Sequence, residues 1–147
     1  MSKPLVVRHW VDAPPATVWH AWTTPELFCQ FFSPEGLSIP LESVVMELHV
    51  GGRFELDMVF DDTGVVNNNA GVIVEMDPPH RFVFNEPGMG IVSTQTFTEV
   101  DGGTLIEVVQ VGLPDEFADN PDVLEAFRSS YRKLGRVLGV ETQNRDR

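Results

Sequence analysis

The sequence predicts an α+β fold in which one long helix lies against an antiparallel sheet. From residue 41 to residue 113, apolar residues alternate with a period of two, which is typical of strands. Short turns rich in Gly, Asp and Pro separate these segments, so consecutive strands are expected to pair as a meander. Residues 121–141 then repeat apolar residues at three- and four-residue steps, which indicates one face of a helix. A meander followed by one amphipathic helix predicts a helix packed on one face of the sheet.

Size and composition indicate one globular domain spanning residues 1–147. The chain is 42% hydrophobic and 22% charged, and this length can bury a core without covalent staples. Its single cysteine, Cys29, excludes an intramolecular disulfide and suits a reducing compartment. No apolar run approaches the roughly 18 residues of a membrane span, and no secretory leader pattern opens the chain. We therefore expect a soluble, cytoplasmic protein, and a homodimer is left open.

The net charge of −12 is distributed unevenly along the chain. Residues 1–127 hold four of the ten basic residues and twenty of the 22 acidic ones, and so carry −16, while the remainder carries +4. An acidic body argues against nucleic acid and anionic membrane as partners, because both need positive potential. The basic residues Arg128, Arg132, Lys133 and Arg136 are expected to complement the end of the last helix and neighbouring carboxylates. Recognition of an acidic partner is the alternative.

The N-terminal part is expected to hold one strand and two short helices. Residues 5–11 are β-rich and predict the first strand. Pro14-Pro15 then suits a helix start, and Val18, Trp19 and Trp22 would form the apolar face of that helix. Thr24-Pro25-Glu26 combines a hydroxyl cap, a proline at the first position and an acid in the first turn, so a second helix start is predicted.

The middle of the chain predicts six strands. The alternating segments are residues 43–48, 53–60, 71–76, 81–85, 91–100 and 104–111. In the second of these, Phe54, Leu56, Met58 and Phe60 fall on one face. Asn67-Asn68-Asn69 is expected to be a bulge or a turn. Asp101-Gly102-Gly103 predicts a hairpin between the last two strands.

The last helix is expected to cover something broad and apolar. Asn120 can cap it, Pro121 suits its first turn, and Asp122 faces the positive end of the helix dipole. Some twenty residues at 1.5 Å each make a rod of roughly 30 Å. Its apolar face is expected to consist of Val123, Leu124, Phe127, Tyr131, Leu134, Val137 and Leu138.

A series of short motifs runs along most of the chain. They are Ala13-Pro14-Pro15, Val18-Trp19, Ala21-Trp22-Thr23, Pro25-Glu26-Leu27, Val50-Gly51-Gly52, Gly71-Val72-Ile73, Pro78-Pro79-His80-Arg81-Phe82 and Gly102-Gly103-Thr104. In this order the chain resembles the START-like (SRPBCC) superfamily from about Val6 to Leu138. It is similar in particular to the AHSA-type branch, named after the activator of a heat-shock chaperone's ATPase. The resemblance implies a helix-grip fold, a curved antiparallel sheet of six to seven strands wrapped around the C-terminal helix with a cavity between. It implies no single activity, since members include lipid and hormone binders, polyketide cyclases and chaperone co-factors.

Alternation assigns an apolar set of side chains to the concave face of the sheet. The set is Phe54, Leu56, Met58, Val72, Val74, Phe82, Phe84, Phe97, Ile106 and Val108, opposite Phe127, Tyr131 and Leu134 on the helix. Gln95 and Gln110 share this register. An unpaired buried amide costs roughly 1–3 kcal/mol, so each glutamine needs a ligand, water, the backbone, the other glutamine or Tyr131 as its partner.

An apolar pocket with a few hydrogen-bonding groups is what a small-molecule site requires. We therefore predict binding of a small hydrophobic or aromatic molecule by Phe54, Leu56, Met58, Phe84, Gln95, Phe97, Val108, Gln110, Phe127, Tyr131 and Leu134. No cofactor and no metal are predicted, because His9, His20, His49 and His80 lack paired ligand spacing and one cysteine cannot form a zinc site.

Two other classes of function remain open. One is an enzyme of the cyclase, dehydratase or hydrolase kind, in which Gln95, Gln110, Tyr131 and His49 orient a substrate. Such an enzyme requires a titratable group with a shifted pKa in the cavity. The other is a protein-interaction module that uses the acidic outer surface and the basic ridge of the last helix.

Overall fold

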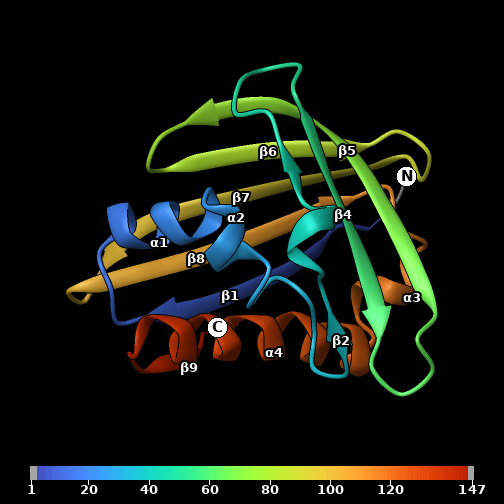
Figure 1. The fold of residues 1–147 in the computed structure, drawn as a ribbon. Coiled ribbons are helices and arrows are strands. Elements are labelled where there is room, and N and C mark those ends of the chain that lie inside the picture. Colours follow the sequence, from blue (N-terminus) through green and yellow to red (C-terminus); the bar gives the residue numbers. More distant parts are fainter. Residues whose placement is uncertain (1–2, 146–147) are drawn as a thin grey trace.

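The computed structural model describes residues 3–145 and shows a curved antiparallel sheet wrapped around a long helix, α4 (Figure 1). The strands are β1 (Leu5–Val11), β2 (Leu37–Ser38), β3 (Val45–Met46), β4 (Arg53–Phe60), β5 (Val66–Asp77), β6 (Arg81–Glu86), β7 (Ile91–Val100), β8 (Gly103–Val111) and β9 (Thr142–Asn144). The helices are α1 (Pro15–Trp22), α2 (Pro25–Phe28), α3 (Asp115–Ala118) and α4 (Pro121–Leu138), with a 3-10 turn, η1, at Leu41–Ser43. The sheet order is β2-β4-β5-β6-β7-β8-β1-β9, and β3 also pairs with β4.

This architecture confirms the predicted α+β helix-grip fold, with more strands than expected. β1, β4 and β7 begin and end where the sequence pattern places them. The described residues form nine strands rather than six or seven, and the additional strands are β2 and β9, of two and three residues. Segments this short cannot display a period of two, so alternation does not reveal them. The strand expected at residues 43–48 is present only as the shorter β3, because η1 extends to Ser43.

The inward face of β5 differs from the prediction. Gly71 pairs with Phe54 and Asn69 pairs with Leu56, and directly paired residues share a face of the sheet. Ile73 therefore points inward and is 1% exposed, whereas Val74 points outward and is 45% exposed, so placing Val72 and Val74 inside is wrong. The run Val72-Ile73-Val74 is apolar throughout, so the sequence does not indicate which of these residues face inward. A register shift between Ile73 and Glu75 then changes the parity again.

The expectation of a bulge or a turn at residues 67–69 is also wrong. The three asparagines belong to β5, where they pair with residues 56–58 of β4. Because Asn69 lies opposite the inward-facing Leu56, its side chain faces the concave side of the sheet. Asn69 is therefore a polar residue on a face that the sequence pattern predicts to be wholly apolar in this region.

Helix α4 begins as predicted and ends earlier. The Oδ1 atom of Asn120 accepts a hydrogen bond from the backbone N–H of Asp122 at 2.9 Å, and Pro121 is the first helical residue. Gly139 adopts a left-handed φ of 70°, which ends the helix at Leu138. Tyr131 and Leu134 lie on the buried face of the helix, against the sheet.

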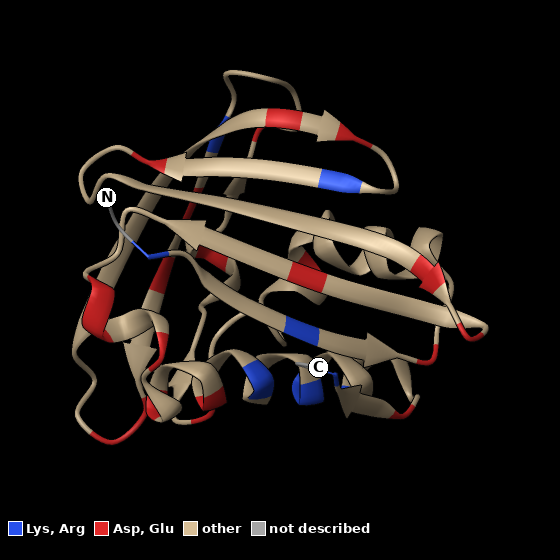
Figure 2. Cartoon of the chain, turned by 180° about the vertical axis from the view of Figure 1, so that it is seen from behind, with Lys and Arg blue, Asp and Glu red and all other residues tan. Residues whose placement is uncertain are grey.

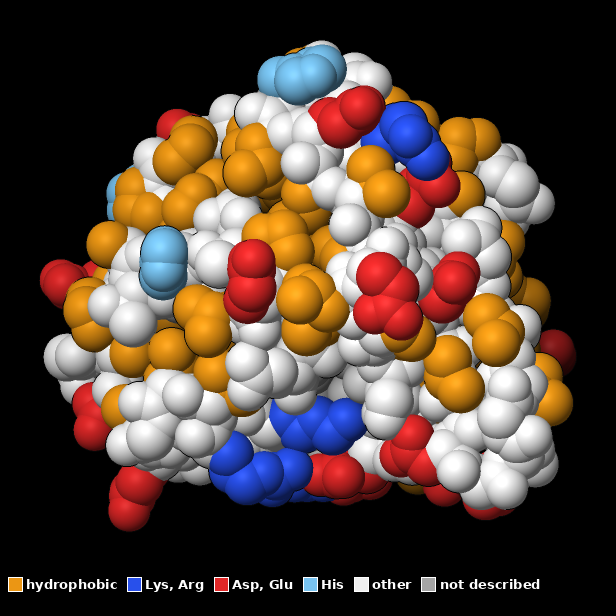
Figure 3. Space-filling model, in the orientation of Figure 1, with side chains coloured by type: hydrophobic (Ala, Val, Ile, Leu, Met, Phe, Trp, Pro, Cys, Tyr) orange, Lys and Arg blue, Asp and Glu red, His pale blue; other side chains and the backbone are white. Residues whose placement is uncertain are grey.

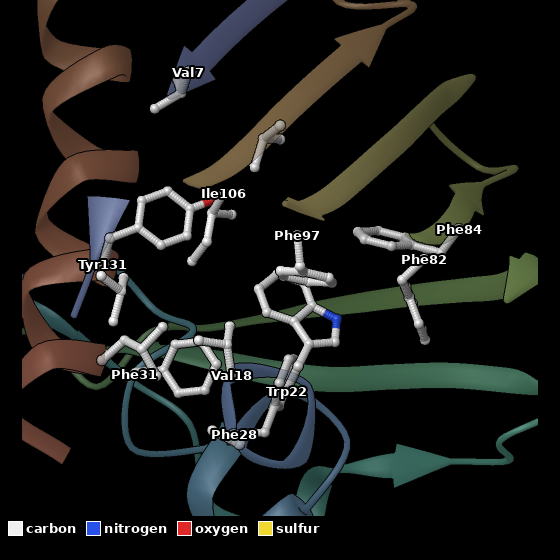
Figure 4. Packing of buried hydrophobic residues seen from close by; sticks show 14 of the residues in the cluster. Val7, Val18, Trp22, Phe28, Phe31, Phe82, Phe84, Phe97, Ile106 and Tyr131 are labelled. Atoms are coloured by element: carbon white, nitrogen blue, oxygen red, sulfur yellow. The ribbon is translucent and has the colours of Figure 1, made fainter. Parts of the chain in front are cut away.

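An aromatic cluster fills one end of the space between the sheet and the helices. Its centre is Trp22, whose ring centroid lies 5.6 Å from that of Phe97 on the sheet and 5.9 Å from that of Phe28 on α2. Figure 4 shows Trp22 between the sheet and the short helices, with Phe31 between it and α4. Such edge-on aromatic pairs contribute about 0.5–1.5 kcal/mol each beyond their burial.

Gly103 is a position where the fold requires the absence of a side chain. A Cβ there would lie 2.7 Å from the Trp10 ring and still closer to the carbonyl oxygen of Val11. We predict that Gly103→Ala lowers the free energy of unfolding by about 1–3 kcal/mol, because neither the ring nor the backbone can move freely. Gly88→Ala is the matched control, since a Cβ at Gly88 meets open space. Urea unfolding followed by tryptophan fluorescence measures both, and equal midpoints would contradict the prediction.

Candidate functional site

A cavity of about 460 Å³ lies between the concave face of the sheet and the N-terminal half of α4. This volume falls within the range of small-molecule sites, about 300–1,000 Å³. Its aromatic walls are Trp22, Phe31, Phe32, Phe54, Phe84, Phe127 and Tyr131. Its other apolar residues are Pro34, Leu56, Met58, Met89, Ile91, Val123 and Ala126. Its polar residues are Asn69, Glu86, Gln110, Asp122 and Ser130.

The structure divides the predicted site residues into two groups. Seven of them line the cavity: Phe54, Leu56, Met58, Phe84, Gln110, Phe127 and Tyr131. The other four, Gln95, Phe97, Val108 and Leu134, are almost fully buried and lie outside the lining, in the packed interior. Alternation identifies the inward face of each strand, but it does not say whether the space above a residue is filled.

Ser93 joins the two inward-facing glutamines. Its Oγ accepts a hydrogen bond from Nε2 of Gln110 at 3.1 Å and another from Nε2 of Gln95. Ser93 pairs with Gln110 across β7 and β8, which brings the two side chains onto the same face. The partner of both amides is therefore a serine that sequence reasoning missed, although it shares the parity of Gln95. The Gln95 Oε1 atom is buried without a hydrogen-bond partner in the described part of the chain.

Tyr131 gives the cavity a polar group on α4. Its ring stacks on that of His9 from β1, with centroids 5.5 Å apart and planes 28° apart. Figure 4 shows the ring extending from the helix toward the sheet. Burial raises the pKa of the Tyr131 phenol well above its usual range, so the hydroxyl stays neutral and able to donate a hydrogen bond. No residue between 3 and 145 forms a hydrogen bond with this hydroxyl.

The segment from Phe32 to Leu37 forms another wall of the cavity, and α4 holds it in place. The Lys133 ammonium donates hydrogen bonds to the carbonyl oxygens of Ser33, Pro34 and Leu37 at 3.0, 3.0 and 3.2 Å. Ser130 donates to the carbonyl oxygen of Phe32 at 3.1 Å. Burial lowers the pKa of Lys133, and these carbonyls take the place of its water.

The basic residues of α4 partly follow the expectation. Arg136 pairs with Glu35 at 2.6 Å and Arg132 pairs with Glu125, so both meet neighbouring carboxylates. Lys133 instead binds backbone carbonyls of a different segment. Figure 2 shows basic residues on α4, while acidic residues are spread over strands, turns and helices.

Glu86 is the cavity residue whose absence from the predicted site matters most. It follows Phe82 and Phe84 with the same parity, and it pairs with the inward-facing Ile91. The strand predicted from sequence ended at Asn85, one residue too early. Burial raises the pKa of the Glu86 carboxyl, and no charged neighbour opposes that effect.

His49, which the sequence offered as a residue that could orient a substrate, lies away from the cavity. His49 is exposed in the turn before β4, where its Nδ1 lies 3.1 Å from the carbonyl oxygen of Val50, and it does not line the cavity. Within residues 3–145, no group of three or more His, Cys, Asp or Glu side chains could hold a metal ion. No helix in the same range is long and apolar enough to cross a membrane.

Comparison with known proteins settles the family. The model of the family described as "Activator of Hsp90 ATPase homolog 1-like protein" matches residues 12–139. The chain belongs to this AHSA1 family. The AHSA-type resemblance of the sequence is therefore confirmed, while no functionally curated protein matches the chain.

Solved structures share the fold of this AHSA1 family member at low identity. A Rhodobacter sphaeroides protein is 23% identical with a TM-score of 0.81, covering 95% of this chain and 93% of its own. A Nitrosomonas europaea protein is 18% identical with a TM-score of 0.81, covering 92% and 94%. An AHSA1-like protein from Aeromonas hydrophila is 17% identical with a TM-score of 0.78, covering 95% and 96%. At these identities the likeness shows the fold alone.

Truncation of two residues on the same face of α4, seven positions apart, distinguishes a core position from a cavity position in this AHSA1 protein. We predict that Leu134→Ala lowers the free energy of unfolding by about 2–5 kcal/mol, because Leu134 is 0% exposed and leaves a new void. Phe127→Ala should cost less, although it removes more atoms, because its side chain already faces open space. Urea unfolding of both variants checks the order. A larger loss at Phe127 would show that the space beneath it is filled.

The pKa of Glu86 gives a test based on pH. Because the folded-state pKa is raised, the native state binds more protons than the unfolded chain, and stability falls as the pH rises above about 4.5, the ordinary glutamate value. We predict that Glu86→Gln unfolds at a higher temperature than the wild type at pH 8 and at nearly the same temperature at pH 4. Thermal unfolding at both pH values measures this difference. A constant difference at the two pH values would mean that ionisation of Glu86 is not its cause.

Proposed function

We propose that this chain binds a small hydrophobic or aromatic molecule in the cavity between the sheet and α4. The observation that carries the proposal is an open space of about 460 Å³ inside an aromatic shell, where a core packed to ordinary density would leave none. A few polar groups lie among apolar walls, which is the usual composition of a ligand site. Membership of the AHSA1 family is compatible with either a ligand-binding module or an ATPase-activator-like module.

Tyr131 and Gln110 are the groups that would orient such a molecule. The Tyr131 hydroxyl has no hydrogen-bond partner within the described chain, and Gln110 uses its Nε2 for Ser93, which leaves its carbonyl oxygen as an acceptor. One donor and one acceptor therefore flank the aromatic walls. Native mass spectrometry of the purified protein, followed by a thermal-shift screen of aromatic and long-chain compounds, would identify occupants.

Filling the cavity from α4 tests the proposal directly. We predict that Ala126→Phe abolishes the thermal shift that a ligand produces, because the new ring occupies the cavity that Ala126 lines. A wild-type protein at a free ligand concentration of 100 Kd gains about 2.7 kcal/mol of stability. Glu125→Phe is the control, since Glu125 is exposed on the same helix. Loss of binding in the control alone, or binding that persists in Ala126→Phe, would contradict the proposal.

Glu86 favours a second candidate, an enzyme that uses the same cavity. A half-buried carboxyl with a raised pKa is the kind of group that donates or accepts a proton during cyclisation, dehydration or hydrolysis. Turnover of a bound compound that disappears in Glu86→Gln, with binding retained, would support this candidate. The family's name refers to activation of the Hsp90 ATPase, and for this chain such an activity stays a prediction for a pull-down at low salt.

A further inference from the structure

We propose that the molecule held in this cavity is a hydrophobic amine whose ammonium group pairs with Glu86. The inference rests on the proposed function, since it names the class of ligand for the same site. Glu86 is the last residue of β6, and its pairing with the buried Ile91 turns its side chain to the concave face. Its backbone carbonyl accepts hydrogen bonds from the N–H groups of Met89 and Gly90, so the turn that follows fixes its position.

The Glu86 carboxylate has no partner within residues 3–145. No side chain there donates a hydrogen bond to it, and no cation lies within ion-pair distance. Two other carboxylates on the sheet are paired: Glu107 with Arg8 at 2.6 Å, and Glu55 with Arg53 at 2.8 Å. A half-buried carboxylate without a partner is unfavourable, and burial alone raises its pKa. A cationic group on the ligand would supply the missing partner.

Charges around the cavity select against an anionic ligand. The lining contains two carboxylates, Glu86 and Asp122, and no Lys, Arg or His. The positive end of the α4 dipole, which could attract an anion, is already occupied by the Asn120 side chain and Asp122. Most Lys and Arg side chains visible in Figure 3 lie along the lower edge of that face, where α4 runs. A fatty acid would therefore bring its carboxylate into a negative environment.

The remaining walls suit the body of an aromatic amine. Phe54 and Phe84 have ring centroids 4.8 Å apart with planes tilted by 47°, and both line the cavity. Aromatic faces attract a nearby cation by about 0.5–2 kcal/mol, and their hydrocarbon surface attracts an apolar body. Tyr131 is an independent indication of a ligand: it is 3% exposed, it lines the cavity, and no described residue meets its hydroxyl. The net charge of −12 would also draw cations to the protein.

Three probes of similar size and different charge test the proposal. They are 2-(1-naphthyl)ethylamine, 2-(1-naphthyl)ethanol and 1-naphthylacetic acid, titrated calorimetrically into the full chain at pH 7.5. We expect the amine to bind at least about tenfold more tightly than the alcohol, which is the effect of one hydrogen bond to a charged group. We expect the acid to bind more weakly than both.

Two variants that each remove one negative charge test whether Glu86 causes the preference for the amine. Glu86→Gln should weaken amine binding about tenfold and leave alcohol binding unchanged, which also shows that the cavity is intact. Glu99→Gln, at an exposed position of β7, should change neither. The amine proposal would be wrong if the amine and the alcohol bound equally, if the acid bound most tightly, or if both variants lost binding equally. None of these results would contradict the proposed function. If none of the probes binds, both the amine and the aromatic-ligand proposal fail.

Discussion

The aromatic contact of Trp22 with Phe97 and Phe28 is the interaction on which the rest of the structure depends. A strongly curved sheet encloses more space than one helix can fill, and α4 alone would leave its concave face exposed. Trp22 brings α1 against the sheet through Phe97, and Phe28 does the same for α2 through Phe54. This packing seals one end of the enclosed space. Trp22 also lines the cavity, so the edge of the aromatic cluster is the inner wall of the site.

The segment that follows α2 also lines the cavity, and polar contacts outside the cavity hold it in place. Lys133 binds three carbonyl oxygens of the segment that follows α2, and the Ser129 hydroxyl accepts a hydrogen bond from the backbone N–H of Glu35 at 3.0 Å. The position of Pro34 in the lining therefore does not depend on what occupies the space. The ring of Phe32 packs on Trp22 with centroids 5.4 Å apart, so aromatic packing and these hydrogen bonds fix adjoining walls of the cavity. A site with such walls loses little conformational entropy when a ligand enters.

Sequence periodicity predicted the fold and part of the site, and its failures have identifiable physical causes. Residues 53–60 alternate cleanly, so the inward positions of Phe54, Leu56 and Met58 could be predicted. The run from Val72 to Val74 is apolar on both faces, so only the pairing of Gly71 with Phe54 reveals that Ile73 is inside. Whether an inward residue meets core or cavity depends on side chains distant in sequence. Phe97 and Phe84 have the same pattern, yet only Phe84 lines the cavity.

Glu86 and Lys133 show why charge in the sequence did not predict the charge of the site. Both are half-buried ionisable groups, and burial disfavours the charged form of each. Lys133 is compensated for the hydration that its ammonium loses, because three backbone carbonyls accept hydrogen bonds from it. Glu86 faces apolar walls and is not compensated by any described residue. A glutamine would fill the same space without the charge, so stability alone does not account for a carboxylate there. The ammonium group of the proposed amine would supply the compensating charge.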